Sequence, residues 1–347
     1  RMLDGKNGAR PKNVHPTGAI EKHVTIDEIP AEHFQVDKFP ECLALEQRLA
    51  AARAIGYHKP FFRVNERVSG VTATIQDCPV VSFASFDYLG MARDPKVVAA
   101  ATEALHQFGT SASASRLVGG NMSIVEDLDH ELASFVGTES AAVFPSGYGT
   151  NASLLGHLFG EGDLILYDEL AHNSIEQGST LSKAQRRPFP HNDYGFVDQL
   201  LRDIRGRFRR VVVALESIYS MDGDFPDLPQ FIDVKRRHKA LLYVDEAHSV
   251  GVMGSRGRGI CEHFGVDPAD GDLWMGTISK ALGSGGGYIA GSASLIQYLK
   301  YTTPAMVFAT GISPANAAAA LASLRLIQED PGRVTRLRDR ATLFLQL

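Results

Sequence analysis

Short apolar runs alternate with amphipathic segments along most of the chain. The runs, many of which end in a polar residue, are PVVSFAS, AAVFPSG, DLILYD, RRPFPHND, RRVVVALES, KALLYVDEA, DLWMGTISK and GGYIAGS. Each has the length of a strand, and PVVSFAS is predicted to be a buried one. Near-continuous apolar strands separated by helices indicate a parallel or mixed sheet that is covered on both faces. The pattern therefore predicts an α/β fold.

Two segments combine helix start and stop signals with an amphipathic pattern. Residues 94–109 begin with Asp94 and Pro95 and end at Gly109, and residues 121–137 have Asn121 as the expected N-cap. Residues 1–30 are polar and predict a loose arm, and residues 60–76 predict a short hairpin. Further helices are predicted over 42–54, 150–159, 197–208, 228–239, 293–301 and 316–327, the last as a packing helix.

Composition narrows the class of protein. A chain of 347 residues has room for about two domains. Its 44% hydrophobic and 22% charged residues exclude an intrinsically disordered chain. A net charge of −5 argues against a basic surface that binds nucleic acid. No apolar run reaches the ~18 residues that a membrane-spanning helix needs. The three cysteines lie far apart, so neither a disulfide framework nor a metal site is expected, and a cytoplasmic location fits best.

Polar residues at the ends of predicted strands are the candidates for chemistry, because α/β sheets bind ligands there. Asp245 follows the run ALLYV, and could act as a base, bind a cation or cap a helix. Lys280 follows another strand, and partial desolvation would make its amine nucleophilic. The alternative is that Lys280 is a solvated loop lysine without a chemical role. The glycines after Lys280 do not fit GxGxxG, which argues against a dinucleotide loop.

The segment FPSGYGTN joins a predicted strand to a predicted helix. Its backbone N–H groups could cradle a phosphate at the helix N-terminus, although an ordinary glycine turn would look the same. It matches neither a P-loop nor a nucleophile elbow. A cradle, an acid and a lysine at one edge of a sheet suit pyridoxal phosphate, which needs a Schiff-base lysine and a partner for its ring nitrogen.

Nine motifs, in order, resemble those of the α-oxoamine synthases, a family of fold-type-I pyridoxal-phosphate enzymes. They are SFDYLGM (85–91), GTSASASRLVGG (109–120), SGYGTN (146–151), DELAHNS (168–174), PHND (190–193), ESIYSMDGD (216–224), VDEAHSVGVMGSRGRG (244–259), GTISKALGSGGG (276–287) and FATGISPA (308–315). The resemblance implies a three-layer α/β/α sandwich with a mostly parallel sheet. The segment before the motifs resembles the lead-in of members that work beside polyketide-type assembly lines.

The resemblance also implies catalytic roles for four residues. Lys280 would hold the cofactor as a Schiff base and later move the Cα proton. Asp245 would keep the pyridine nitrogen protonated, and His248 would hydrogen-bond the phenolic oxygen. His172 would stack on the ring face, although it could also be a loop histidine that caps a carbonyl.

Five further positions would bind the cofactor by the same resemblance. The backbone of Gly147 and Tyr148, with the hydroxyls of Ser220 and Thr277, would hold it, unless those hydroxyls only stabilise turns. Thr310 would reach the phosphate of a partner subunit's cofactor, which implies a homodimer with shared active sites.

The roles of three residues in these motifs stay open. Arg116 could contact substrate or form a surface ion pair, and Glu216 could orient its neighbours or cap a strand. Phe86 stands where several members have Asn, so substrate contacts on that side are uncertain.

The implied reaction is the decarboxylative condensation of an amino acid with an acyl thioester. Glycine, alanine or serine would react with an acyl-CoA or an acyl carrier protein, and carbon dioxide and a free thiol would be released. Transamination, another reaction of the same cofactor, and a non-catalytic partner subunit are the alternatives.

Three parts of the chain are expected. Residues 1–79 would form an arm, helix and hairpin, and residues 80–315 the large cofactor-binding domain. Residues 316–347 would begin a small C-terminal domain that is otherwise absent, as in a fragment of a longer protein.

Overall fold

The computed structural model describes residues 25–57 and 61–347, which form two compact units. One comprises the described residues up to Glu66 together with Thr74–Cys78, and the other comprises Arg67–Ala73 with Pro79–Leu347. Most of the loose arm predicted over residues 1–30 lies outside the described residues. The three-part division predicted from the sequence stays a prediction, and each unit is described by itself below.

The first unit holds the predicted helix over 42–54. It contains three short 3-10 helices and one α-helix, none of which buries a residue: Ile26–Glu28, Ala31–His33, Val36–Lys38 and α1 (Pro40–Ala54). Pro40 stands at the first helical position of α1, where its missing N–H costs no hydrogen bond.

A small three-stranded sheet follows α1 in the chain. Its strands β1 (Arg67–Ser69), β2 (Thr72–Ile75) and β3 (Cys78–Val81) lie in that order, and β1 with β2 confirms the predicted hairpin. The prediction of a buried strand at PVVSFAS is wrong, because β3 ends at Val81 and is mostly exposed. The reason is its pairing partner: β3 is an edge strand of this small sheet and is not part of the large one.

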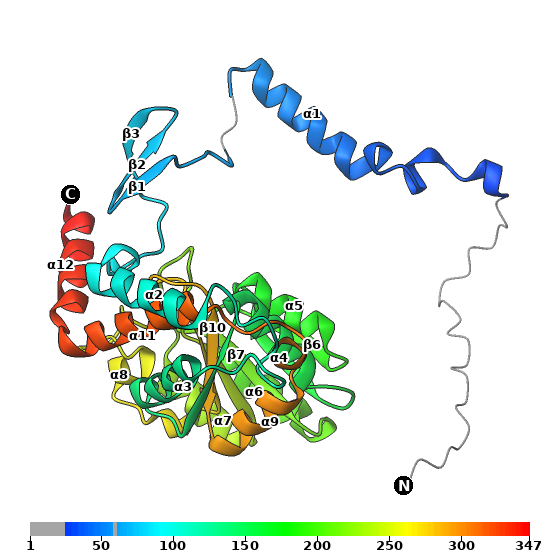
Figure 1. Ribbon diagram of the computed structural model, residues 1–347. Helices are drawn as coiled ribbons and strands as arrows, with labels where there is room; N and C mark the ends of the chain where they lie inside the picture. The colour runs from blue at the N-terminus through cyan, green and yellow to red at the C-terminus, as the bar shows by residue number, and fades with distance from the viewer. Residues whose placement is uncertain (1–24, 58–60) are drawn as a thin grey trace, which may run out of the picture. The chain divides into compact units, whose positions relative to one another are not determined.

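A seven-stranded sheet forms the centre of the second unit (Figure 1). All seven remaining apolar runs form strands in it, as predicted. Only β10 runs antiparallel to its neighbours, so the sheet is mostly parallel. The order across the sheet is β4 (Ser140–Phe144), β10 (Gly287–Gly291), β9 (Leu273–Thr277), β8 (Leu241–Asp245), β7 (Val211–Glu216), β5 (Leu164–Asp168) and β6 (Gln185–Phe189).

Helices cover both faces of this sheet and form two hydrophobic clusters. Alternate residues of a strand enter different clusters, as Val213 and Ala214 of β7 do. One face is covered by α2 (Pro95–Phe108), α3 (Ser123–Val136), α6 (Tyr194–Ile204), α7 (Leu228–His238), α8 (Ile260–Phe264) and α11 (Pro314–Glu329). The other face is covered by α4 (Gly147–Leu158), α5 (Asn173–Leu181), α9 (Ala293–Thr302) and α10 (Pro304–Val307). The three-layer α/β/α architecture is confirmed.

Local signals predict most of these helices well. Asp94 caps α2 by accepting from Lys96 N, and the helix ends before Gly109. The predicted packing helix is α11, most of which is buried. Four α-helices lie outside the predicted ranges: α5, α8, α10 and α12 (Gly332–Gln346), which follows α11.

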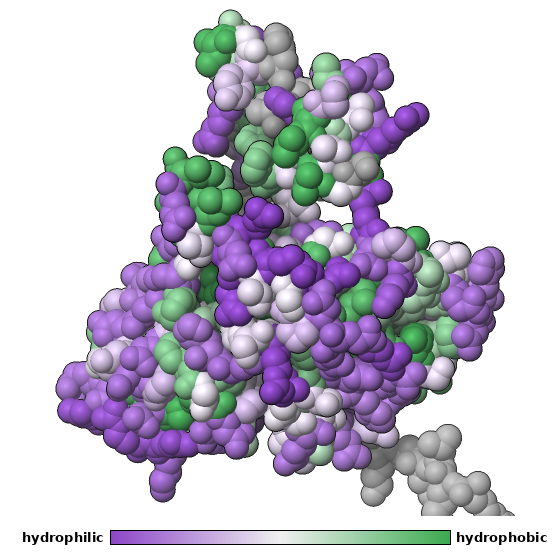
Figure 2. Space-filling view, turned by 90° about the vertical axis from the view of Figure 1, so that its left-hand side faces the viewer, coloured by the Kyte–Doolittle hydropathy of each residue, from purple (hydrophilic) through white to green (hydrophobic). Residues whose placement is uncertain are grey.

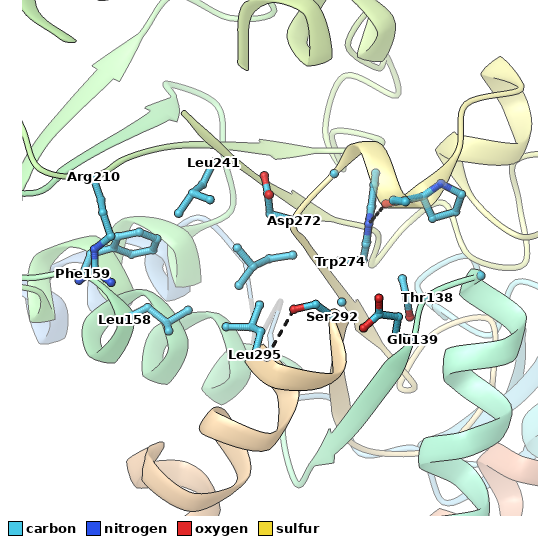
Figure 3. A pocket seen from close by; sticks show the side chains of 16 residues that line it. Thr138, Glu139, Leu158, Phe159, Arg210, Leu241, Asp272, Trp274, Ser292 and Leu295 are labelled. Atoms are coloured by element: carbon cyan, nitrogen blue, oxygen red, sulfur yellow. Dashed lines mark hydrogen bonds between the residues drawn. The ribbon is translucent and has the colours of Figure 1, made fainter. Parts of the chain in front are cut away.

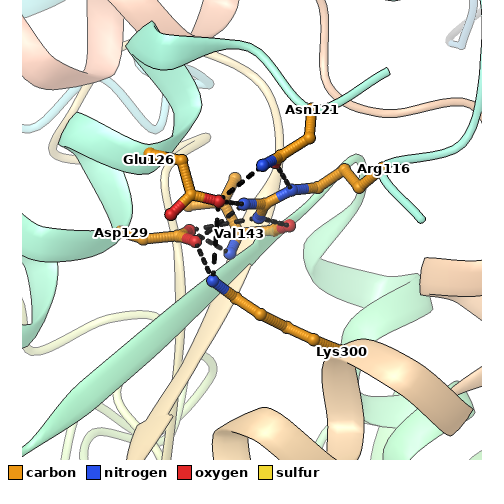
Figure 4. Close-up of polar contacts among 6 residues, drawn as sticks. All are labelled: Arg116, Asn121, Glu126, Asp129, Val143 and Lys300. Carbon is orange, nitrogen blue, oxygen red and sulfur yellow. Dashed lines mark hydrogen bonds and ion pairs between the residues drawn. The ribbon is translucent and has the colours of Figure 1, made fainter. Parts of the chain in front are cut away.

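The predicted cap of α3 is wrong, because Met122 and not Asn121 precedes the helix. The Asn121 side chain instead accepts from Arg116 Nε at 2.8 Å and donates to Glu126 at 2.7 Å. Arg116 is therefore part of a buried network and not a surface ion pair (Figure 4). Its guanidinium also binds Asp129 at 2.8 Å, and Lys300 reaches the same carboxylate from α9 at 2.8 Å.

This network holds β4 in place. Asp129 Oδ1 accepts from Val143 N at 2.8 Å, and Arg116 donates to Val143 O at 3.3 Å. The pair therefore fixes the backbone of β4 three residues before Ser146, where α4 begins.

Hydrophilic side chains predominate on the face of the molecule in Figure 2, and hydrophobic ones gather there in small separate patches. Among residues 25–57 and 61–347, no helix is long and apolar enough to cross a membrane.

Replacing Arg116 by Met should lower the free energy of unfolding by about 3–5 kcal/mol, because Asp129 would lose a charged partner inside the protein. Urea unfolding measures the loss. Arg325→Met is the matched control, since Arg325 pairs with Glu131 at the surface and should contribute about 0–1 kcal/mol. Equal losses in the two variants would contradict a structural role for the buried network.

Candidate active site

Four parallel strands end in polar residues at one edge of the large sheet. Asp168 ends β5, Glu216 ends β7, Asp245 ends β8 and Thr277 ends β9. Glu216 and Asp245 are direct neighbours in the register of β7 and β8. Thr277 pairs with Gly287, the first residue of antiparallel β10, so that strand begins at the same edge.

A cavity of about 120 Å³ opens at this edge. Seven of the residues predicted for the site line it: Gly147, Tyr148, His172, Asp245, His248, Thr277 and Lys280. Its other lining residues are Asn151, Ser174, Glu216, Ala247 and Met275. Ser220 and Thr310 do not line the cavity, and both are exposed.

Asp245 is held by hydrogen bonds deep in this cavity. Asn151 Nδ2 donates to Asp245 Oδ2 at 2.7 Å, and Ala247 N donates to Oδ1 at 2.9 Å. Tyr243 OH fixes the Asn151 amide by donating to its oxygen at 2.5 Å. Burial raises the pKa of Asp245, and the donated hydrogen bonds act against that rise. The carboxylate is thus held at the wall of the cavity.

Lys280 and His248 lie in a line that ends at Tyr88. Lys280 Nζ is 2.6 Å from His248 Nε2, and His248 Nδ1 is 2.7 Å from Tyr88 OH. Burial, together with the charges of Lys280 and His172, lowers the pKa of His248 to about 4. The imidazole is therefore neutral at pH 7, so Nε2 accepts from the ammonium and Nδ1 donates to Tyr88.

The amine of Lys280 is itself easier to deprotonate than an ordinary lysine. Burial lowers the pKa of Lys280, and the carboxylates of Asp245 and Glu216 act against that shift. Phe86 contributes to the apolar surroundings, since the centre of its ring lies 5.9 Å from Nζ. A partly desolvated lysine of this kind can serve as a nucleophile or a base near neutral pH.

Glu216 orients a neighbour, which is one of the two roles considered for it. Its carboxylate accepts from the backbone N–H of His172, the residue that caps α5. His172 Nδ1 lies 2.7 Å from Ser174 Oγ, which holds the ring in place. Burial and the neighbouring Asp245 raise the pKa of Glu216 to about 8.

The segment predicted as a cradle forms the N-terminus of α4, which begins at Gly147 and not at residue 150. Ser146 accepts from Gly149 N, which leaves the N–H groups of Gly147 and Tyr148 without a partner inside the helix. A Cβ at position 147 would lie 2.8 Å from Thr277 Oγ1, so only glycine fits there. Thr277 in turn donates to Gly286 O at 2.9 Å.

Sequence reasoning missed Asn151, Ser174 and Tyr243. Asn151 follows Gly147 by four residues and lies on the same helical face, a spacing that points it at the same strand ends. Ser174 follows His172 by two residues inside the DELAHNS motif. No local signal marks Tyr243, because its partner on α4 is distant in sequence.

A larger cavity of about 420 Å³ lies at the opposite edge of the sheet (Figure 3). It is lined by the first residues of β8 and β9, Leu241 and Leu273. Its charged groups already have partners: Asp272 binds Lys235, and Glu139 accepts from Ala293 N. Figure 3 shows Trp274 donating to a backbone carbonyl. No chemistry is therefore assigned to this second cavity.

Comparison with known proteins places the chain in a family. The model for aminotransferase class I and II matches residues 79–347. The chain belongs to the aminotransferase class I and II family. An 8-amino-7-oxononanoate synthase of Geobacter sulfurreducens is 44% identical over 75% of this chain and 66% of the relative. The resemblance to the α-oxoamine synthases is confirmed.

Solved structures agree with this family assignment. A serine palmitoyltransferase of Sphingomonas wittichii has a TM-score of 0.78 and 34% identity, covering 84% of this chain and 72% of its own. A variant serine palmitoyltransferase from S. paucimobilis, with a bound PLP–myriocin aldimine, has a TM-score of 0.78 and 31% identity, covering 84% and 73%. The predicted fold-type-I pyridoxal-phosphate transferase fold is confirmed.

Replacing the buried Glu246 by Gln should flatten the pH dependence of stability. Burial raises the pKa of Glu246 to about 8, so the folded protein keeps a proton that the unfolded chain loses above its ordinary value. Stability contributed by this group therefore falls as pH rises from about 4.5 to about 8, by up to about 1.4 kcal/mol per pH unit.

Urea unfolding between pH 5 and pH 8 measures this slope. Glu103→Gln, at an exposed position of α2, should keep the wild-type slope. A slope that Glu246→Gln leaves unchanged would contradict the assignment.

Proposed function

We propose that the protein is a pyridoxal-phosphate-dependent α-oxoamine synthase. It condenses an amino acid with an acyl thioester and releases carbon dioxide and a free thiol. The observation that carries the proposal is the cavity at the carboxyl edge of the sheet. There a desolvated lysine, a hydrogen-bonded buried carboxylate and a helix N-terminus converge in a chain whose relatives carry the names of such synthases.

The residues of the cavity fit pyridoxal phosphate. The free N–H groups of Gly147 and Tyr148 at the start of α4, with the Thr277 hydroxyl, suit its phosphate. Asp245 suits its pyridine nitrogen, because a cation beside a buried carboxylate restores the ionised form. When bound, the cofactor supplies an electron sink that stabilises negative charge on the amino acid's Cα.

Lys280 does two jobs in this proposal. Its Nζ would hold the cofactor covalently until an amino acid takes its place, and the released amine would then take the proton from the amino acid's Cα. The lowered pKa of Lys280 keeps part of the amine neutral, as a base requires. In the other neutral tautomer His248 would accept from Tyr88 OH at Nδ1 and carry its proton on Nε2, the atom 2.6 Å from Nζ, where it would donate to the phenolic oxygen that the cofactor would bring.

The remaining residues hold these groups in place. Asn151 keeps Asp245 oriented, and Ser174 keeps the His172 ring oriented so that it covers one face of the cofactor and excludes water. Glu216 fixes the backbone at His172. None of these residues has to change its partners during the reaction.

The active unit in this proposal is a homodimer. Thr310 is exposed and lies outside the cavity of its own chain, between α10 and α11. Phe308 beside it is 85% exposed, which an interface with a second copy would cover. Thr310 would then donate to the phosphate bound by the partner subunit.

Lys280→Ala should abolish both cofactor attachment and product formation. Wild-type protein should show an absorbance band near ~420 nm with pyridoxal phosphate. It should release thiol and carbon dioxide only when an amino acid and an acyl thioester are both present. Glycine, alanine and serine are tested in turn with acyl-CoA and with acyl carrier protein. Lys183→Ala, at an exposed position, is the control and should behave as wild type.

Three outcomes would contradict the synthase. Keto acid formed from the amino acid without thiol release would indicate an aminotransferase. A cofactor band without turnover of any tested pair of amino acid and acyl thioester would contradict the proposed substrate class. No band in either protein would indicate a non-catalytic subunit.

Mixing Lys280→Ala with Thr310→Asp protein should restore activity if sites are shared. Each variant alone should be inactive, because one lacks the amine and the other repels the phosphate. In a mixed dimer one site would carry both defects and the other neither. Random exchange of subunits then returns about a quarter of wild-type activity. Activity that stays at the level of the single variants would contradict a shared site.

A further inference from the structure

His191 of the PHND segment has no role in the proposed chemistry, yet it joins two segments that border the site. Its Nδ1 lies 2.9 Å from Asp168 Oδ1, at the end of β5. Its Nε2 lies 2.9 Å from Asp224 Oδ2, at the end of the loop 217–224. The Tyr219 ring lies nearly perpendicular to the imidazole, with 4.4 Å between the ring centres.

The Asp168 side of this contact leads to His172. Asp168 is fully buried, and the same oxygen that contacts His191 accepts from Leu170 N at 2.9 Å. Ala171 N donates to Asp168 O, which closes the turn just before His172. Anything that holds the Asp168 carboxylate therefore also holds the turn from which His172 enters the cavity.

The Asp224 side leads to Ser220. Tyr219 N donates to Asp224 O at 3.0 Å, and Gly223 N donates to Tyr219 O at 2.8 Å, so the loop is closed around Ser220. At its other end the loop continues from Glu216, which lines the cavity. Ser220 itself is exposed, so its position relative to the cavity depends on how firmly the two ends of the loop are held.

Holding both ends requires a protonated imidazole. Carboxylates only accept, so both ring nitrogens of His191 must donate, which neutral histidine cannot do. The other groups that face the ring are Glu169, which accepts from His191 N at 3.2 Å, the uncharged Tyr219 ring and the uncharged Asn192 amide. Asn192 Nδ2 lies 3.2 Å from His191 Nε2 and donates to Asp224 Oδ2 at 3.1 Å. The described surroundings of this imidazole are therefore negative or neutral.

We propose that His191 is a positioning residue whose imidazolium ties the Ser220 loop to the turn before His172, and so sets how tightly the cofactor is held. The proposal rests on the proposed function, which gives Ser220 and His172 their cofactor contacts. The two charge-assisted hydrogen bonds act on opposite sides of the site. Losing either one leaves Asn192 as the remaining bridge, since its N–H donates to Asp168 and its amide to Asp224, and so loosens the tie between the two segments.

The proposal carries a pH dependence with a defined sign. Partial burial lowers the pKa of His191, but the hydrogen bonds and charges of Asp168 and Asp224 outweigh it, and the net shift is upward. The clamp is thus complete below the ordinary histidine pKa. It is lost as the pH rises through the raised value.

His191→Gln tests the clamp, because glutamine is uncharged and reaches only one carboxylate. At pH 6.5 the dissociation constant of pyridoxal phosphate should rise about tenfold, since one charge-assisted hydrogen bond is lost. At pH 9 wild type should have weakened toward the variant, and the two should differ by less than about threefold. Asp224→Asn should act in the same way from the loop side, and His130→Gln, at an exposed position of α3, is the control.

Hydrogen exchange of residues 217–224 in cofactor-free protein gives an independent readout. After correction for intrinsic rates, exchange should be faster in both variants at pH 6.5 and should equal wild type at pH 9. Variants whose exchange rates and cofactor affinities equal those of wild type at every pH would overturn the proposal. A loss of cofactor affinity that is the same at every pH would also overturn it. Wild type that fails to bind the cofactor would refute the proposed function, while the exchange data would still decide the clamp.

Discussion

Two carboxylates buried side by side at the ends of β7 and β8 impose the strictest condition on this structure. Glu216 and Asp245 are each 3% exposed and pair directly in the sheet register. Like charges in a medium of low dielectric repel strongly, so they persist only with donors or a cation close by. Asn151 from α4, the backbone N–H of His172 and the amine of Lys280 meet that need. The helices and loops around the cavity are therefore arranged around this pair.

The same condition shapes the reactivity of the site. Burial pushes the carboxylates toward the protonated form, and it pushes Lys280 and His248 toward the neutral form. Each shift favours moving a proton within the cavity. A cationic ring nitrogen beside Asp245 would balance the negative charge of Glu216 and Asp245. A cofactor with a basic ring nitrogen and an aldehyde for the lysine matches both demands.

The two edges of the large sheet differ in how their polar groups are used. At the amino edge the charged side chains of the larger cavity already have partners, since Asp272 pairs with Lys235 and Glu139 accepts from Ala293 N. At the carboxyl edge the free N–H groups of α4, the Lys280 amine and the Asp245 carboxylate point into the cavity without full partners among the described residues. Parallel strands place their ends, and the loops that follow them, together at that edge. Ser220 does not line the cavity. The position of its loop therefore depends on contacts such as those that His191 makes with Asp168 and Asp224.

Periodicity and local signals were sufficient for the seven strands and the ends of α2, because these depend on neighbours in sequence. The motifs also named seven residues that the structure places around one cavity. Sequence reasoning failed where distant pairing decides. The strand β3 was misassigned because an apolar run does not say which sheet it joins. Asn121 pairs with Arg116 instead of capping α3. Asn151 and Asp245 are 94 residues apart, and only the packing of α4 on the sheet brings them together. The sequence by itself thus determined which groups are available at the strand ends. The tertiary structure decided which of them share a proton, a charge or a partner, because burial and distance act between residues that the chain keeps far apart.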